Sequence, residues 1–293
     1  MNLLGRFFWF LGWLCCRLGH RGRLVIAVIL AWIWFDVLRI RRKVVLENLA
    51  VAFPNMSLIE RTQLGRRNLV HLCLVILEYG LFVEMDPGVA RRDFDWDGLE
   101  VVDAELKKGK GLFLLGMHMG NGDLAIAAFS ELGYPTVLIS KLIHWKVLND
   151  LWFGMRAKHG TRFIAPERSS FEIMRSLKKN QVVIFVLDQF MGPPVGCRTQ
   201  FFGKETGTAM GLATLQIRSE APVVTCWTER GPGGRHRVIF RKFEGQIDQG
   251  PDAEVDANIR SLTQQYTSKI EEVVRARPDQ WMWLHRRWKV FGW

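Results

Sequence analysis

The chain has 293 residues, a length that fits one large domain or two moderate ones. Its composition, 48% hydrophobic and 24% charged, excludes a disordered or low-complexity protein. The formal net charge of +11 favours an anionic partner such as nucleic acid, an acidic protein or a lipid headgroup surface. The five cysteines follow no metal-ligand or disulfide pattern, so we expect reduced thiols and no metal site.

Two apolar stretches at residues 7–16 and 24–38 are separated and followed by basic residues, and each is shorter than the ~20 residues that span a bilayer. The first fifty residues carry a charge of +6, which argues against a diffuse nucleic-acid surface. We expect a membrane-seated helical pair or one tilted anchor, with the remaining chain cytoplasmic. A pair of buried core helices is the alternative. The expected anchoring residues are Trp9, Trp13, Trp32, Trp34, Arg39, Arg41 and Arg42.

Beyond this region, short apolar runs alternate with helical patterns. Ser57 and Glu60 form a capping box that begins an apolar helix, and an amphipathic pattern from Val255 ends at Pro278. We expect strands at 111–117, 135–140, 161–165, 181–187, 222–228 and 237–243, and helices at 123–132, 145–159, 169–179 and 208–219. This order predicts an α/β fold with a mixed, largely parallel central sheet flanked by helices. Residues 1–45 would be the anchoring region and residues 46–293 a single α/β domain.

The strand predicted at 111–117 ends in the most informative segment of the sequence. It delivers His118, which is followed by Gly120, Asn121 and then Asp123 at the start of a helix. Ligands of α/β sheets gather at the carboxyl ends of strands. We expect Asp123 to fold back onto the imidazole ring, fixing its tautomer and leaving the other nitrogen free to take a proton from a hydroxyl. The alternative is a buried histidine beside an unrelated helix-terminal aspartate.

Asp188 and Gln189 follow the strand predicted at 181–187, where they suit hydrogen bonds to a polar ligand. An aspartate that caps the next loop is an equally good interpretation. Arg156 and Arg168 flank the strand predicted at 161–165, and a guanidinium there would suit a phosphate or a developing oxyanion.

The last part of the chain, residues 278–289, interleaves tryptophans with basic residues. It predicts either a membrane-facing strip or lid over a lipid site, or a structural clasp held by cation–π contacts. The sequence holds no serine-hydrolase elbow, Walker loop or zinc-protease motif.

Taken together, these motifs resemble the bacterial lipid A biosynthesis acyltransferases, the late lauroyl/myristoyl transferases. That family also includes mycobacterial phosphatidylinositol-mannoside acyltransferases. The matching segments are 41–54 (ending Asn-Leu-x-x-Ala-Phe-Pro), 116–123 (Gly-x-His-x-Gly-Asn-x-Asp), 156–160 (Arg-x-x-x-Gly), 188–203 (Asp-Gln leading to Phe-Phe-Gly) and 278–289 (Pro-x-Gln-Trp-x-Trp-Leu-His-Arg-Arg-Trp-Lys). The chain departs from many members in having Gly122-Asp123 for Trp-Glu, and Ser140-Lys141-Leu142 for an arginine-rich stretch.

The resemblance implies a glycerophosphate acyltransferase-like fold and an enzyme without a cofactor at the cytoplasmic side of the bacterial inner membrane. It would move a fatty acyl chain from an acyl-carrier-protein thioester to a hydroxyl of a membrane glycolipid precursor, most simply in lipid A assembly. Acyl carrier protein, the glycolipid and membrane lipids would be its partners, and nucleic acid would not. By position, His118 would be the general base and Asp123 its orienting partner. The expected substrate-binding residues are Asn121, Lys141, Arg156, Arg168, Asp188 and Gln189.

Three alternatives remain open at this point. The first is acylation of another lipid, such as a phosphatidylinositol mannoside, a lysophospholipid or an ornithine lipid. The second is a thioesterase, because the same histidine would also activate water. The third is a non-catalytic lipid-binding protein of the same fold.

Overall fold

The computed structural model describes residues 10, 12–15, 17–140, 146–165, 169–248, 250 and 254–289. Its helical elements are α2 (Gly19–Trp32), η1 (Ile33–Val37), α3 (Arg42–Ala52), α4 (Leu58–Glu78), η2 (Tyr79–Val83), α5 (Pro87–Arg92), α6 (Leu99–Leu106), α7 (Gly122–Glu131), α8 (Lys146–Lys158), α9 (Ser169–Lys178), α10 (Gly211–Ser219), η4 (Pro232–Gly234) and α11 (Val255–Ala276). Its strands are β1 (Phe94–Asp97), β2 (Leu112–Gly116), β3 (Thr136–Ile139), β4 (Arg162–Ile164), β5 (Val182–Val186), β6 (Gly196–Phe201), β7 (Lys204–Ala209), β8 (Val223–Arg230) and β9 (His236–Lys242).

The central sheet of this described part has the strand order β1-β9-β8-β2-β5-β3-β4. Strands β8, β2, β5, β3 and β4 are parallel to one another, whereas β9 runs antiparallel to β8 and pairs in parallel with β1. A mixed, largely parallel sheet is therefore confirmed, and all six predicted strands are present. Strand β1 and the separate antiparallel β6–β7 hairpin were not predicted.

Apolar clusters cover both faces of the sheet. In β2, Phe113 and Leu115 point into one cluster, whereas Leu112 and Leu114 point into the other. The first cluster includes side chains of α9, α10 and α11, and the second includes side chains of α5, α6 and α7. Because both faces are covered, β2 is buried along its whole length and reads as an unbroken apolar run.

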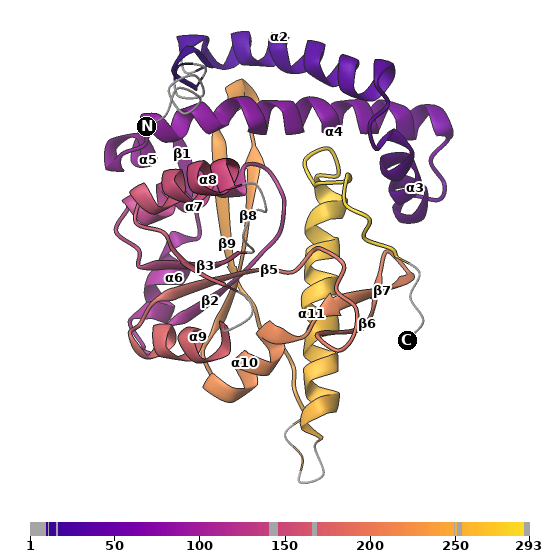
Figure 1. The fold of residues 1–293 in the computed structure, drawn as a ribbon. Helices are drawn as coiled ribbons and strands as arrows, with labels where there is room; N and C mark the ends of the chain where they lie inside the picture. Colours follow the sequence, from indigo (N-terminus) through magenta and orange to yellow (C-terminus); the bar gives the residue numbers. More distant parts are fainter. Residues whose placement is uncertain are drawn as a thin grey trace.

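The apolar stretch at residues 24–38 forms most of α2 together with η1, and α2 lies along α4 at one end of the molecule (Figure 1). Ala27, Ala31 and Phe35 bury one side of this segment in the first cluster. Its other side is exposed and apolar, so a pair of fully buried core helices is not what forms. The exposed side chains are Leu24, Val25, Val28, Ile29, Leu30, Trp32, Ile33, Val37 and Leu38.

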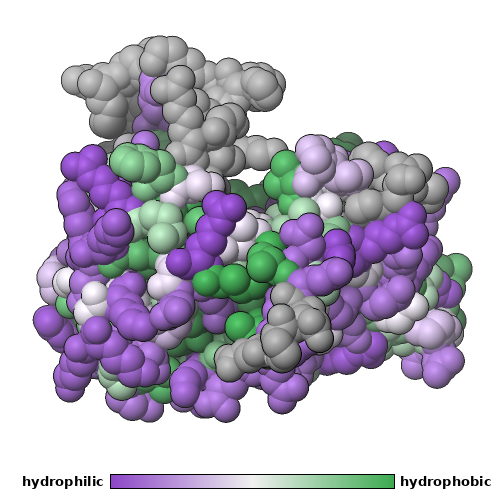
Figure 2. All heavy atoms as spheres, turned by 90° about the horizontal axis from the view of Figure 1, so that it is seen from below, coloured by the Kyte–Doolittle hydropathy of each residue, from purple (hydrophilic) through white to green (hydrophobic). Residues whose placement is uncertain are grey.

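Among the described residues, no helix combines the length and the apolar character required to cross a membrane. The stretch at 7–16 is only partly described, and Trp9 lies outside the described residues. Seen from the end opposite α2, the molecule is mostly hydrophilic, with hydrophobic side chains visible in a limited central area (Figure 2).

Two local predictions about helix ends are confirmed. At the start of α4, the backbone N–H of Glu60 donates to the Ser57 hydroxyl at 3.3 Å, and the backbone N–H of Ser57 donates to the Glu60 carboxylate at 2.7 Å. Helix α11 ends at Ala276, shortly before Pro278.

The C-terminal segment is a buried clasp rather than a membrane-facing strip. Trp281, Trp283 and Arg287 are at most 1% exposed, and the Arg287 guanidinium lies 5.0 Å from the centre of the Phe201 ring. The interleaving of tryptophan and arginine therefore serves packing between the β6–β7 hairpin and the N-terminal helices α3 and α4.

Candidate active site

His118 and Asp188 lie side by side because their strands are neighbours in register. The parallel pairing of β2 with β5 aligns Gly116 with Val186. Each side chain stands two residues beyond its strand, so the same register brings the two together. The backbone N–H of His118 donates to Asp188 Oδ2 at 2.8 Å, and the ring atom Nδ1 lies 2.7 Å from Asp188 Oδ1.

Asp188 is itself fixed from a third direction. The indole N–H of Trp281 donates to Asp188 Oδ2 at 2.7 Å, and the carboxyl group is 2% exposed. Burial raises the pKa of Asp188, but the charge of His118 and the hydrogen bonds from His118 and Trp281 outweigh it, so this pKa is lowered overall. Asp188 is therefore a carboxylate, and Nδ1 of His118 carries the proton that it accepts.

The second ring nitrogen of His118 remains available. Its side chain is 39% exposed, and Nε2 lies 3.4 Å from the side-chain nitrogen of Gln189. Burial lowers the pKa of His118, but Asp188 and, to a smaller extent, Asp123 raise it, and the net shift is upward. The arrangement is that of a general base, with one nitrogen oriented by a carboxylate and the other open to a substrate proton.

The prediction that Asp123 orients the imidazole ring is corrected by this geometry. Asp123 Oδ2 accepts a hydrogen bond from the Tyr79 hydroxyl at 2.6 Å, and Oδ1 pairs with the Arg156 guanidinium. Asp123 lies in the first turn of α7, so its side chain turns toward α8 and η2 while Asp188 occupies the position at Nδ1 of His118. Asp123 acts on His118 through its charge.

Arg156 lies on α8 and is 6% exposed. Besides its ion pair with Asp123, its guanidinium lies 4.3 Å from the centre of the Trp152 ring. The structure therefore brings Arg156 into the His118 site, but with Asp123 as its partner. Lys141 and Arg168 lie outside the described residues.

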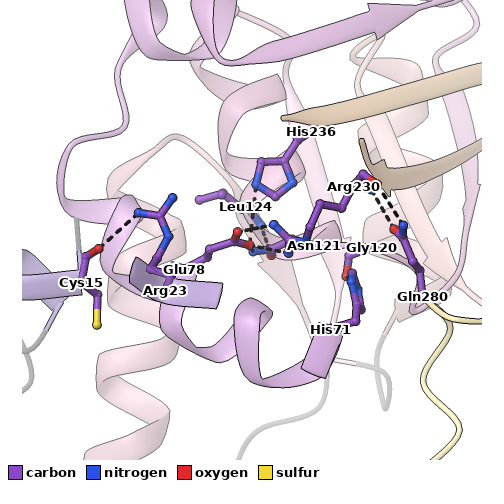
Figure 3. A network of polar contacts seen from close by, with 10 residues as sticks. All are labelled: Cys15, Arg23, His71, Glu78, Gly120, Asn121, Leu124, Arg230, His236 and Gln280. Carbon is purple, nitrogen blue, oxygen red and sulfur yellow. Dashed lines mark hydrogen bonds and ion pairs between the residues drawn. The ribbon is translucent and has the colours of Figure 1, made fainter. Parts of the chain in front are cut away.

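Asn121 is part of the framework of the site. It is 1% exposed, its side-chain oxygen accepts from the backbone N–H of Leu124 at 3.2 Å, and its amide donates to Glu78 at 3.0 Å. Figure 3 shows Asn121, Arg230 and His236 converging on Glu78. Arg230 donates to Glu78 Oε2 at 2.7 Å, so a buried ion pair between α4 and the end of β8 holds the cap of α7.

The turn after His118 requires glycine. Gly120 has φ of 62°, and a Cβ atom there would collide with Oγ1 and the backbone oxygen of Thr228. The carbonyl of Gly120 accepts from His71 Nε2 at 3.2 Å, and its N–H donates to the carbonyl of Gln280 at 3.2 Å. Burial lowers the pKa of His71 to about 4, so this contact is made by a neutral ring.

The loop that carries Asp188 and Gln189 is held by the C-terminal clasp. Arg287 donates to the backbone carbonyl of Gln189 at 3.1 Å, and the backbone N–H of Phe190 donates to Nε2 of His285 at 3.0 Å. Burial lowers the pKa of His285 to about 4, which keeps its Nε2 an acceptor. Within the described part of the chain, no group of three His, Cys, Asp or Glu side chains is arranged to hold a metal ion.

Sequence reasoning missed His71, Glu78 and Arg230, which no local motif marks because each acts by contacts over more than forty residues of sequence. Gln280 and Arg287 lie in the motif at 278–289, but the sequence assigned them no individual role. The one available signal was that two polar segments, at His118 and Asp188, follow strongly apolar runs that are best placed at the centre of a parallel sheet.

Comparison with known proteins identifies the family of the chain. The model of the family described as bacterial lipid A biosynthesis acyltransferase matches residues 3–290. The lipid A biosynthesis lauroyltransferase of Escherichia coli is 25% identical over 260 residues, covering 85% of this chain and 79% of that protein. The palmitoleoyltransferase of the same organism is 25% identical over 259 residues, with coverages of 86% and 80%.

A more distant relative acts on a different lipid by name. The phosphatidylinositol mannoside acyltransferase of Mycobacterium tuberculosis is 23% identical over 196 residues, covering 65% of this chain and 58% of that protein. With a histidine held by a buried carboxylate at the strand ends and a match over nearly its whole length, the chain is an acyltransferase that belongs to the bacterial lipid A biosynthesis acyltransferase family.

Proposed function

We propose that the protein transfers a fatty acyl chain from an acyl-carrier-protein thioester to a hydroxyl of a membrane glycolipid precursor in lipid A biosynthesis. The observation that carries the proposal is the pair formed by His118 and Asp188 at adjacent strand ends, with the His118 side chain 39% exposed. The family match and the names of the relatives support the choice of acyl chemistry and of the lipid pathway.

In the proposed reaction, Nε2 of His118 takes the proton of the acceptor hydroxyl as its oxygen attacks the thioester carbonyl. The carbon–sulfur bond of the tetrahedral intermediate then breaks, and the leaving thiolate takes the proton from the imidazolium. Asp188 stabilises the imidazolium between these steps. A thioester is already activated, so this route needs neither a metal nor a covalent acyl-enzyme.

Other predicted residues are candidates for contact with the substrates. Gln189, beside Nε2 of His118, is placed to meet the attacking hydroxyl or the donor. Arg156 and Asp123 would shape the wall of the site through their ion pair, and Lys141 and Arg168 stay predictions as headgroup contacts.

We further propose that residues 1–45 seat the enzyme on the cytoplasmic face of the bacterial inner membrane, with residues 46–293 as the acyltransferase domain. The exposed apolar side of α2 and η1 supports this, as do the basic residues that follow it. Trp13, Trp32 and Trp34 belong to this region, and the Trp32 side chain is 58% exposed. A soluble acidic carrier protein would be attracted to a chain of charge +11.

A second acceptor class has specific support. The mycobacterial relative is named a phosphatidylinositol mannoside acyltransferase, so a phosphatidylinositol mannoside is a second candidate acceptor for this chain. The experiment below separates the proposed reaction from transfer to other acceptors, from hydrolysis of the thioester and from lipid binding without turnover.

The test is mass spectrometry of a detergent-solubilised reaction that contains a mixed pool of acyl carrier protein thioesters and a tetra-acylated lipid A precursor. Wild type should add the mass of one acyl chain. His118→Ala should lower the rate by at least about 100-fold, because the positioned base is removed. The variant should melt at a lower temperature, because the buried Asp188 loses its ring partner, but it should keep a cooperative transition, because the His118 backbone N–H and the Trp281 indole still donate to that carboxylate.

The other outcomes have distinct meanings. An intact donor and acceptor with wild type would contradict the lipid A proposal, and the reaction would then be repeated with a phosphatidylinositol mannoside. Release of free fatty acid without acylated product would identify a thioesterase. Equal product formation by wild type and His118→Ala would exclude His118 as the base.

A further inference from the structure

A cavity of ≈ 580 Å³ lies between the loop before α3, α3 itself and the first turn of α4. Four basic side chains line it, together with one carboxylate, that of Glu47, and two apolar side chains. The basic side chains are Arg39, Arg42, Lys43 and Arg61. A pocket with this excess of positive charge favours an anion.

Two of the four cations keep their charge available for a ligand. Arg39 donates to the backbone carbonyl of Asp36 at 3.4 Å, and Arg61 donates to the backbone carbonyl of Ser57 at 3.4 Å. Neither makes an ion pair with a carboxylate of the described residues. By contrast, Arg42 pairs with Asp36 at 3.2 Å.

The backbone beside the cavity has an unusual conformation at Arg39, which lines the cavity, and at Arg41, which does not. Arg39 and Arg41 have φ values of 54° and 56°, in the left-handed region that arginine rarely adopts. Strain of this kind persists where the surrounding structure imposes it, and it concentrates at binding sites. Helix α3 then begins with Arg42 and Lys43 and has neither an acidic residue in its first turn nor a side-chain cap, so the helix dipole adds to the positive field.

Exposed aliphatic residues lie within three residues of Arg39 and Arg61 in the sequence, and we call them the apolar rim. Val37, Leu38 and Ile40 are 51–59% exposed on one side, and Leu58 and Ile59 are 62% and 69% exposed at the start of α4. The first group begins at the last residue of η1 and follows the exposed apolar side chains of α2 along the chain. An acidic protein or a nucleic acid would leave these aliphatic side chains in water, whereas a lipid brings a phosphate and hydrocarbon together.

We propose that this cavity binds the phosphate of an anionic membrane phospholipid, with Arg39 and Arg61 as its main contacts and the alkyl chains lying along the apolar rim. The site is separate from the acyl-transfer centre at His118. It rests on the proposed membrane seating and adds a preference for lipid charge to it.

The test is flotation of the full-length protein with vesicles of phosphatidylcholine, alone or mixed with phosphatidylglycerol. The double variant Arg39→Gln with Arg61→Gln should bind the mixed vesicles about 30-fold more weakly than wild type, at roughly five-fold per cation near an anionic surface. Binding to phosphatidylcholine alone should change little. The control is Arg175→Gln with Arg218→Gln, which removes two exposed cations from α9 and α10 and should behave as wild type.

A charge-preserving variant distinguishes a specific phosphate site from general electrostatic attraction to an anionic membrane. Arg39→Lys with Arg61→Lys keeps the net charge but loses the planar guanidinium fork, so a specific phosphate site predicts a clear loss of binding to the mixed vesicles. If the lysine variant or the glutamine variant binds the mixed vesicles as tightly as wild type, the proposal is wrong.

Two other outcomes have different meanings. If wild type binds neither kind of vesicle, the membrane seating is refuted. If the variants bind vesicles normally but capture acyl carrier protein more weakly, the cavity binds that protein instead. Melting curves of all variants check that they fold.

Discussion

At the scale of single residues, His118 is fixed through both its backbone and its ring by one carboxylate. Asp188 accepts from the His118 backbone N–H, pairs with the ring and accepts from the Trp281 indole. Because the Asp188 carboxylate has three contacts, it stays beside the imidazole ring when the ring becomes charged. The geometry for proton transfer is therefore present before a substrate arrives.

Asp123 provides a residue-scale prediction. Asp123→Asn leaves the Arg156 guanidinium, 7% exposed, without its carboxylate partner. We expect the free energy of unfolding to fall by about 3 kcal/mol, as for other buried ion pairs that lose one member. Denaturant unfolding of the purified protein measures this change.

Tyr79→Phe is the matched control for Asp123→Asn. It removes a single hydrogen bond to the same carboxylate and leaves the ion pair intact, so the loss should be about 1 kcal/mol. If both variants unfold like wild type, Asp123 does not hold Arg156 in the way described.

The sequence predicted the candidate catalytic histidine but not the carboxylate that orients it. The position of His118 at a strand end was clear from its apolar run. Asp123 was predicted to orient the ring because it is near His118 in sequence. The choice between Asp123 and Asp188, however, depends on which strand lies next to β2. That order is set by packing of the whole sheet, and no local pattern reveals it.

At the scale of elements, helices α3 and α4 hold the C-terminal clasp by hydrogen bonds. The amide of Asn48 on α3 donates to the backbone carbonyls of Trp283 at 2.8 Å and His285 at 2.7 Å. Asn68 on α4 likewise donates to the carbonyls of Asp279 and Trp281. The N-terminal helices thus hold the clasp that in turn holds Asp188.

Asn48→Ala should therefore destabilise the protein. It leaves two carbonyl groups of the clasp without their donor at a site where Asn48 is 6% exposed, and the expected loss is about 2 kcal/mol. Asn258→Ala is the control, because Asn258 also makes two hydrogen bonds, both with Asp248, but at an exposed site. Thermal unfolding compares the two, and an equal effect would argue against the clasp.

The elements themselves were largely predictable where their pattern was strong. The six predicted strands are short apolar runs bounded by turns, and most helices carry caps or an amphipathic stripe. Strand β1 has only four residues, two of them aspartates, and β7 is rich in Thr and Gly, so neither resembles a buried strand. Strand β1 is set by its pairing with β9, which lies far along the chain, and β7 by its pairing with the neighbouring β6.

At the scale of the molecule, the exposed apolar surface and the candidate active site are joined through one helix. Helix α4 packs against α2 and, through His71 and Glu78, contacts Gly120 and Asn121 beside His118. The opposite end of the molecule is mostly hydrophilic (Figure 2). This polarity fits an enzyme that takes one substrate from a membrane and the other from water.

The pH dependence of acyl transfer is the measurement that decides whether Asp188 orients His118 as the base. The base must be neutral, and the pKa of His118 is raised above its ordinary 6.5, so the wild-type rate should increase with pH through a pKa above 6.5. Asp188→Asn removes the charge that raises this pKa. It should shift the rising limb to lower pH and reduce the maximal rate by at least about 100-fold. A limb at the wild-type position, or a rate close to wild type, would contradict the account.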